Sequence, residues 1–229
     1  MGFDTETVMA NQAAESLRET LGNCTTELFT EFPYGAGKTD LVIANISDTY
    51  LQRRLTELDL DRPIDPAYLQ AFVLLHRRDK ITQEYFNQLY NNSHQSTENV
   101  LNWLHNHGFI QKTTDGKIRT APNLRRHVTT SFAVELKLSK WKKALKQAYR
   151  AKSYTDYQFI ALDKSHVDPA LANREQFEKY GVGIISIAES GRCTVHYRPE
   201  RNDPVTPTTV WKLNEKTLTS PTFNHAAAD

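Results

Sequence analysis

The sequence has little of what marks a secreted or membrane protein. Its 229 residues include only two cysteines, Cys24 and Cys193, too few for a disulfide framework or a cysteine cluster around a metal. No apolar run approaches the roughly 20 residues that span a bilayer. The acidic start of the chain also has no apolar signal-peptide region. We therefore expect a cytoplasmic protein without a membrane partner.

Two familiar motif classes are also incomplete. Residues 35–39 resemble the end of a phosphate-binding loop, but the first glycine is absent at the required spacing and a strand is expected where a helix should follow. The histidines, among them His94, His105 and His107, have no carboxylate or cysteine partner at metal-ligand spacing. The sequence thus argues against a P-loop nucleotide site and against a histidine-based metal site.

Charge is balanced overall but uneven along the chain. The net charge of +1 gives no indication of a nucleic-acid partner. Between Leu138 and Lys152, however, there are six basic residues and no acid, in a segment predicted as a helix. Lys142, Lys146 and Arg150 recur every four residues and would form one basic line on that helix. Such a line fits contacts with the phosphates of DNA.

Hydrophobic periodicity separates the chain into an α/β part and a helical part. In residues 131–139 apolar side chains alternate with others, so Glu135 and Lys137 lie on one face of a strand. Further strands are predicted at 26–32, 39–46, 158–162, 181–188 and 193–198, and helices at 6–21, about 140–154 and 173–180. Residues 50–127 instead predict mainly helices, which indicates an inserted domain.

The predicted helices of the middle segment are followed by a hairpin around Asp115-Gly116. Residues 81–120 resemble a winged helix-turn-helix, in which the third helix enters the major groove of DNA and the hairpin touches the backbone. The resemblance implies base contacts from Gln95, Ser96, Thr97 and Asn99, and wing contacts from Lys112, Lys117 and Arg119. The alternative for this segment is a small helical subdomain that binds protein.

Without residues 50–127, the order of elements and three charged residues resemble a known superfamily. Asp40 opens the second predicted strand, and Glu135 and Lys137 form a Glu-x-Lys in the third. This pattern, with K-Q-A-Y at 146–149, resembles the restriction-endonuclease-like PD-(D/E)XK nucleases. The implied fold is an α/β mixed-sheet core with helices on both faces and an inserted winged helix domain. The predicted boundaries are a core at 1–49 and 128–200, an insertion at 50–127 and a C-terminal extension at 201–229.

The resemblance also implies a chemistry. Asp40, Glu135 and the carbonyl of Leu136 would hold Mg²⁺ (or Mn²⁺), because these ions take hard oxygen ligands. Lys137 would orient the attacking water or stabilise developing negative charge, and Glu15 (or Glu19) would be a further acid from the first helix. The implied function is a metal-dependent DNA endonuclease acting on double-stranded or branched DNA. We expect a homodimer, because cutting both strands usually takes two active sites.

Other interpretations stay open. A Glu-x-Lys alone is usually a solvated pair on an exposed strand, and Gln147 and Tyr149 would either support a site or simply pack. Asp40 and Glu135 are 95 positions apart where the superfamily uses a short hairpin, and Thr39 stands where it commonly has proline. The alternatives are a catalytically silent nuclease-like DNA-binding or regulatory protein, and a protein-interaction module of a larger complex.

Overall fold

The chain divides into two compact units. The structure, a computed structural model, describes residues 2–35, 37–90 and 96–220. The sheet unit comprises Met1–Ile46 and Val128–Thr206, and the helical unit comprises Ser47–His127 and Pro207–Asp229. The segment predicted as an insertion therefore makes up most of the helical unit, and the C-terminal segment is grouped with it. None of the described helices is long and apolar enough to cross a membrane.

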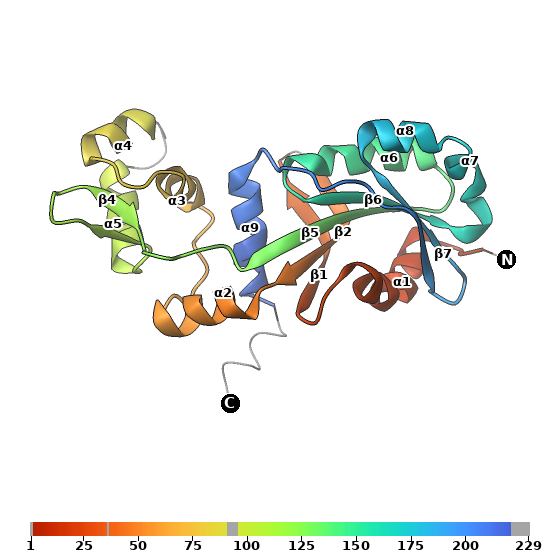
Figure 1. The fold of residues 1–229 in the computed structure, drawn as a ribbon, viewed down its shortest axis with the longest axis horizontal. Coiled ribbons are helices and arrows are strands. Elements are labelled where there is room, and N and C mark those ends of the chain that lie inside the picture. Colours follow the sequence, from red (N-terminus) through yellow and green to blue (C-terminus); the bar gives the residue numbers. More distant parts are fainter. Residues whose placement is uncertain (1, 36, 91–95, 221–229) are drawn as a thin grey trace. The chain divides into compact units, whose positions relative to one another are not determined.

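The sheet unit is built on one six-stranded mixed sheet (Figure 1). Its spatial order is β1 (Thr26–Tyr34), β2 (Gly37–Ile46), β5 (Val128–Lys137), β6 (Tyr157–Asp163), β7 (Gly183–Ile187) and β8 (Cys193–Tyr197). β5, β6 and β7 run parallel, while β1–β2, β2–β5 and β7–β8 are antiparallel pairs. The parallel pairs need crossover connections, and helices supply them.

Helices cover both faces of the sheet (Figure 1). They are α1 (Glu6–Leu21) on one face and α6 (Trp141–Arg150), α7 (Asp168–Leu171) and α8 (Arg174–Tyr180) on the other. Alternate residues of β6 show the division, because Phe159 packs in the cluster with α1 and Ile160 in the cluster with α6 to α8. Since both faces are covered, β5 and β7 are buried over nearly all their residues. The predicted α/β class is confirmed as a mixed sheet flanked by helices.

The helical unit consists of helices and one small hairpin. Its elements are α2 (Asp48–Gln52), the π-helix η1 (Arg53–Glu57), α3 (Leu69–His76), α4 (Gln83–Leu89), α5 (Thr97–Asn106), β3 (Ile110–Lys112), β4 (Ile118–Thr120) and α9 (Pro207–Thr217). β3 pairs antiparallel with β4, and an isolated bridge joins Ile81 to Ile118. Three helices followed by a hairpin thus occur in the predicted order.

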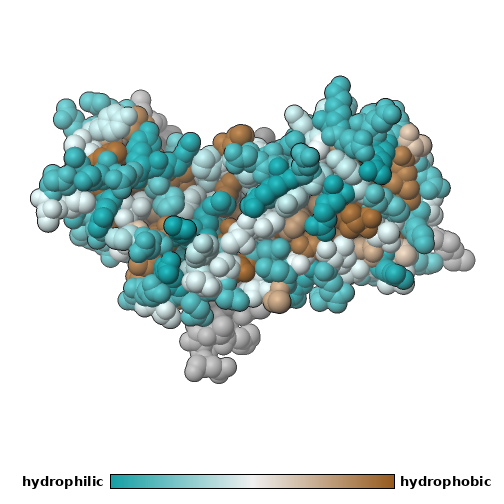
Figure 2. Space-filling model, in the orientation of Figure 1, coloured by the Kyte–Doolittle hydropathy of each residue, from teal (hydrophilic) through white to brown (hydrophobic). Residues whose placement is uncertain are grey.

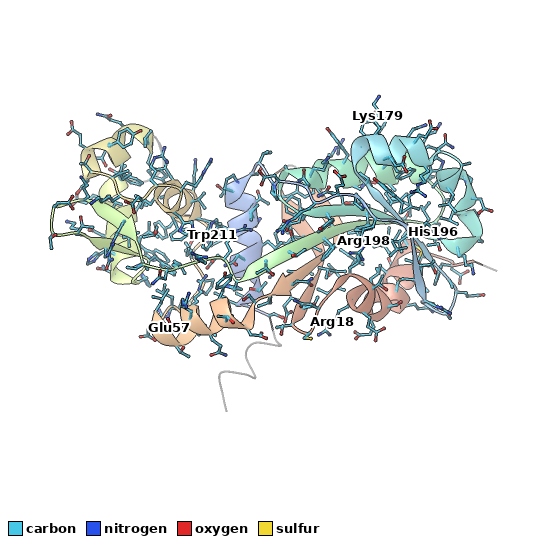
Figure 3. The ribbon with its side chains drawn as sticks, in the orientation of Figure 1. Arg18, Glu57, Lys179, His196, Arg198 and Trp211 are labelled. Atoms are coloured by element: carbon cyan, nitrogen blue, oxygen red, sulfur yellow. The ribbon has the colours of Figure 1, made fainter. Side chains whose placement is uncertain are left out.

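Two parts of the helical unit differ from the prediction. The first predicted helix of this segment is not a single α-helix, because α2 passes into a π-helix that carries the buried Arg54. The segment expected as an extension forms α9, which carries Trp211 (Figure 3). Trp211 packs edge-on against Phe72 and His76 of α3. Prolines and threonines obscured this helix in the sequence, although Pro207 at its first position is compatible with helix formation.

Candidate functional site

Strand pairing brings Asp40 and Glu135 together despite their separation in the sequence. The antiparallel ladder between β2 and β5 runs from Ile46 and Val128 to Leu41 and Val134. Asp40 and Glu135 are the next residues on their strands, so they lie beside each other at the end of this ladder. The long insertion between the two strands leaves this geometry intact.

The Asp40 carboxylate ties the ends of the two strands together. Its Oδ2 accepts a hydrogen bond from the backbone N–H of Leu136 at 2.9 Å and from Nζ of Lys137 at 3.3 Å. The Asp40 side chain is partly exposed, with 31% of its surface accessible. It therefore faces solvent while it holds two groups of β5.

Lys137 is buried and surrounded by acceptors. Its Nζ donates to Oε2 of Glu6 at 2.9 Å and to the carbonyl of Leu136 at 2.6 Å, in addition to Asp40. Burial alone would lower the pKa of Lys137, but the hydrogen bond to Glu6 and the charge of Asp40 raise it above the usual value. The side chain therefore stays an ammonium at neutral pH, in one position.

Glu135 is the opposite case. It is fully buried, and within the described residues neither of its carboxylate oxygens has a hydrogen-bond partner of normal geometry. Burial, and then the charge of Asp40, raise the pKa of Glu135 to about 8, against the opposing charge of Lys137. An unpartnered buried carboxylate is costly, and such perturbed groups concentrate at functional sites.

Aromatic rings close one side of this site. Tyr154 stacks on Tyr34 and Phe32, with ring centroids 5.1 and 5.6 Å apart, and its hydroxyl donates to Oγ1 of Thr39 at 2.7 Å. Burial raises the pKa of Tyr34, and the charge of Glu135 raises it further. The rings thus adjoin Glu135 and keep water from it. Sequence reasoning missed them, because both tyrosines lie just outside the segments that carry the motif.

The helix acid at the site is Glu6, and the predicted Glu15 is elsewhere. Glu15 is exposed and lies 3.9 Å from Arg18 of its own helix, and Glu19 is also exposed. Nine residues of helix separate Glu6 from Glu15, which is about 13 Å along the axis. Glu6, in the first turn of α1, is the acid of this helix that contacts Lys137. The prediction of an acid from this helix therefore named the wrong residue, Glu15.

The basic residues predicted on α6 are exposed, as contact with a polyanion requires. Lys142, Lys146 and Arg150 all lie on the solvent side of the helix. Tyr149 is also exposed, whereas Gln147 is half-buried and its Oε1 has no partner within the described residues. Tyr149 therefore contributes little to the core.

The predicted DNA contacts of the helical unit are divided. Ser96, Asn99, Lys112 and Arg119 are exposed, and Thr97 is half-buried. Lys117 is also half-buried, and its Nζ lies 3.2 Å from the carboxylate of Asp115. Gln95 lies outside the described residues. The helical unit thus offers exposed polar groups on α5 and the hairpin, with one wing lysine already paired.

The site has the donor set for a hard cation, namely two adjoining carboxylates and the carbonyl of Leu136. A group of three or more His, Cys, Asp or Glu side chains placed for a metal ion does not occur in residues 2–35, 37–90 and 96–220. The unpartnered oxygens of Glu135 nevertheless fit a cation, because Mg²⁺ takes one or two carboxylates and keeps several waters. No protein-family model, curated protein or solved structure matches the chain.

Proposed function

We propose that the sheet unit is a metal-dependent DNA endonuclease of the restriction-endonuclease-like type, and that the helical unit binds or selects the DNA as a winged helix. One observation carries this proposal. Glu135 is fully buried without a hydrogen-bond partner of normal geometry among the described residues, and it adjoins Asp40. Asp40 accepts from the backbone N–H of Leu136 and from the Lys137 ammonium. Most buried side-chain polar atoms of proteins are hydrogen-bonded, so the two oxygens of Glu135 call for an explanation.

The topology of the sheet unit supports the same proposal. A helix, three antiparallel strands, a helix and a parallel strand follow in the order α1, β1, β2, β5, α6 and β6. The superfamily that the sequence resembles is expected to have this order. Asp40 on β2, with Glu135 and Lys137 on β5, supports the proposal, because the two strands are neighbours in the sheet.

The residues present fit a divalent metal, held by Asp40, Glu135 and the carbonyl of Leu136. When bound, such an ion lowers the pKa of a coordinated water and offsets charge on the phosphate. Glu135 must lose its proton for this, so metal binding is linked to proton release. Burial raises the pKa of Glu135 and so opposes this deprotonation, which the charge of a bound cation would favour.

The remaining residues have roles of their own. The Lys137 ammonium would orient the attacking water or stabilise negative charge developing on the phosphate oxygens. Glu6 positions that ammonium through its hydrogen bond and keeps it charged. Lys142, Lys146 and Arg150 would contact phosphates without reading sequence. Two copies of the chain would supply one active site for each strand of a duplex.

A nicking assay on supercoiled plasmid tests the proposal. We expect the wild-type protein to nick or cut DNA with Mg²⁺ or Mn²⁺ and not with EDTA. Asp40→Asn, Glu135→Gln and Lys137→Ala should each abolish cleavage while DNA binding stays within about twofold. Glu15→Gln is the matched control on α1, because its carboxylate lies away from the site. Absence of metal-dependent cleavage on supercoiled, linear and branched DNA would overturn the endonuclease proposal.

One observation favours a second candidate, a catalytically silent nuclease-like regulator. Lys137 already donates to Glu6, Asp40 and the carbonyl of Leu136, so the ammonium occupies the acceptors that a metal would use. Titration calorimetry with Mn²⁺ separates the candidates. Binding that rises with pH and is lost in Glu135→Gln supports the enzyme, and no binding at any pH supports the silent protein.

A further inference from the structure

A surface pocket lies between α6 and α8 of the sheet unit. It has a volume of about 390 Å³ and is lined by Lys142, Leu145, Lys146, Tyr149, Arg150, Gln176 and Tyr180. This volume lies within the range of small-molecule pockets, roughly 300–1,000 Å³. The lining combines aromatic rings with cations. Two packed helices do not need this combination at their exposed edge.

Two tyrosines form the aromatic part of the pocket. Tyr149 and Tyr180 meet in a T-shaped contact with ring centroids 5.4 Å apart. They remain 48% and 39% exposed, and are among the few large hydrophobic side chains left on the surface within the described residues. Rings held against each other but open to solvent can stack with a planar ligand at low entropic cost.

Cations surround these rings. Lys142, Lys146 and Arg150 are exposed along α6, and Lys152 lies 5.6 Å from the ring centroid of Tyr149 and donates to the carbonyl of Tyr180. Lys179 lies 5.9 Å from the Tyr180 ring and projects from α8 away from the sheet (Figure 3). The surface over α8 is hydrophilic (Figure 2).

Acids near the pocket do not balance these cations. Glu178 of α8 is bound to Arg174 through an Nε–Oε1 contact of 2.7 Å, and Glu175 is the other acid of the helix. The local charge is therefore positive, and an anionic ligand with flat rings is complementary to it. Nucleic acid has both properties, but its bases are accessible only where they are unpaired.

Arg150 of the pocket lies near Tyr34, which in turn lies near Glu135. Burial and the charge of Glu135 raise the pKa of Tyr34, and the charge of Arg150 opposes them. Glu135 itself is buried, but Asp40 beside it is partly exposed. A DNA strand that contacts Asp40 can continue past the exposed cations of α6 towards Tyr149 within the same unit.

We propose that the pocket between α6 and α8 is a stacking site for unpaired bases of a single strand, with Tyr149 and Tyr180 as the platform and the lysines and Arg150 as phosphate contacts. It assigns the substrate class of the proposed endonuclease as DNA with an unpaired segment, such as an overhang, flap or junction. Only that last step rests on the proposed function, because the binding itself needs no cleavage.

Fluorescence anisotropy in EDTA tests the pocket without cleavage. The probes are a labelled oligothymidylate of about 12 nucleotides, an abasic strand of equal length, and a blunt duplex. We expect tighter binding of oligothymidylate than of the abasic strand at equal salt. Tyr149→Ala and Tyr180→Ala should each weaken oligothymidylate binding by roughly 5- to 150-fold. Neither should alter binding of the abasic strand.

Matched variants separate stacking from folding. Tyr149→Phe keeps the ring and should retain wild-type affinity. Tyr85→Ala removes a tyrosine of similar exposure, 45%, from α4 of the helical unit. It should leave the difference in affinity between oligothymidylate and the abasic strand as in the wild type. Equal affinity for oligothymidylate and abasic strand, or a Tyr149→Ala variant that binds both normally, would overturn the proposal. So would tyrosine-dependent binding of an acidic peptide in place of DNA. A protein that binds single strands but never cleaves overturns the endonuclease and leaves this site standing.

Discussion

The sheet unit buries Glu135 and the helical unit buries Glu215, and the two glutamates differ in their hydrogen-bond partners. Glu215 of α9 accepts from Nη1 and Nη2 of Arg54, both at 2.7 Å, and from the backbone N–H of Ile64 at 2.7 Å. Arg54 is itself 1% exposed and also bonds the carbonyls of Leu60 and Arg62. Glu135 has no such partner among the described residues.

The difference between the two glutamates lies in how the negative charge is compensated. A bidentate arginine–carboxylate pair with its other groups bonded satisfies both ions in place, and it fixes η1 to α9. Glu135 has no such ion pair, because the Lys137 ammonium donates to Asp40 and Glu6. Burial, and then the charge of Asp40, raise the pKa of Glu135 to about 8. Burial alone therefore does not distinguish the two glutamates, whereas their hydrogen-bond partners do.

The largest expected effect is on the satisfied pair. Arg54→Ala leaves Glu215 buried without its main partner, so the free energy of unfolding should fall by about 3–5 kcal/mol. Urea denaturation followed by circular dichroism measures this loss. The double variant Arg54→Met with Glu215→Leu is the control, because it removes both charges together and should lose much less. A single variant as stable as the wild type would show that the pair contributes no stability.

The next largest effect is expected for Glu135, whose replacement by glutamine should raise the free energy of unfolding at high pH. The folded protein binds this proton more tightly than the unfolded chain, since the pKa rises from 4.5 to about 8. Its stabilising contribution is therefore complete below about pH 4.5 and is lost as pH rises towards 8, by up to about 1.4 kcal/mol per pH unit. Glu135→Gln should remove this slope and be more stable than the wild type at pH 9.

Urea titrations in EDTA at pH 5, 7 and 9 check this expectation. Glu19→Gln serves as the control, because this glutamate is exposed on α1 and its variant should follow the wild type at every pH. A Glu135→Gln variant that is less stable than the wild type at pH 9 would mean that the carboxylate is satisfied after all, like Glu215.

The smallest effect tests the surface charges of the two units. Lys146→Ala should flatten the dependence of DNA affinity on salt by about 0.9 in the log–log slope, since one phosphate contact is lost. Asn99→Ala on α5 should leave that slope unchanged and reduce discrimination among duplex sequences. Anisotropy titrations at four salt concentrations distinguish the two results. Unchanged affinity in both variants would assign α5 and α6 to other partners.

Local patterns predicted the sheet unit well. The alternation in β5 and the four-residue repeat of α6 are strong periodic signals, and they placed Glu135, Lys137 and the basic line correctly on their elements. The bounds of β2 also put Asp40 near its start. These residues follow from the chain itself, because each depends on the spacing within one element.

The missed residues depend on contacts between elements. Glu6 reaches Lys137 because the start of α1 lies beside the end of β5, which no spacing within α1 reveals. Tyr34 and Tyr154 meet across 120 positions of sequence. The helix α9 was missed for a different reason. Prolines and threonines at its start favour irregular structure, and its apolar residues are buried only because they pack against α3. Tertiary context therefore supplied what local propensity could not.

One backbone hydrogen bond changes the cost of joining β2 to β5. The N–H of Ser47 donates to the carbonyl of His127 at 2.8 Å, so the helical unit begins and ends at touching residues. Loop-closure entropy grows with the length of free chain, at about 0.6 kcal/mol per doubling. Once residues 47–127 have folded, their two ends are adjacent, so pairing β2 with β5 loses little further chain entropy. Asp40 and Glu135 are 95 positions apart in the sequence, yet little free chain then remains to be closed between their strands.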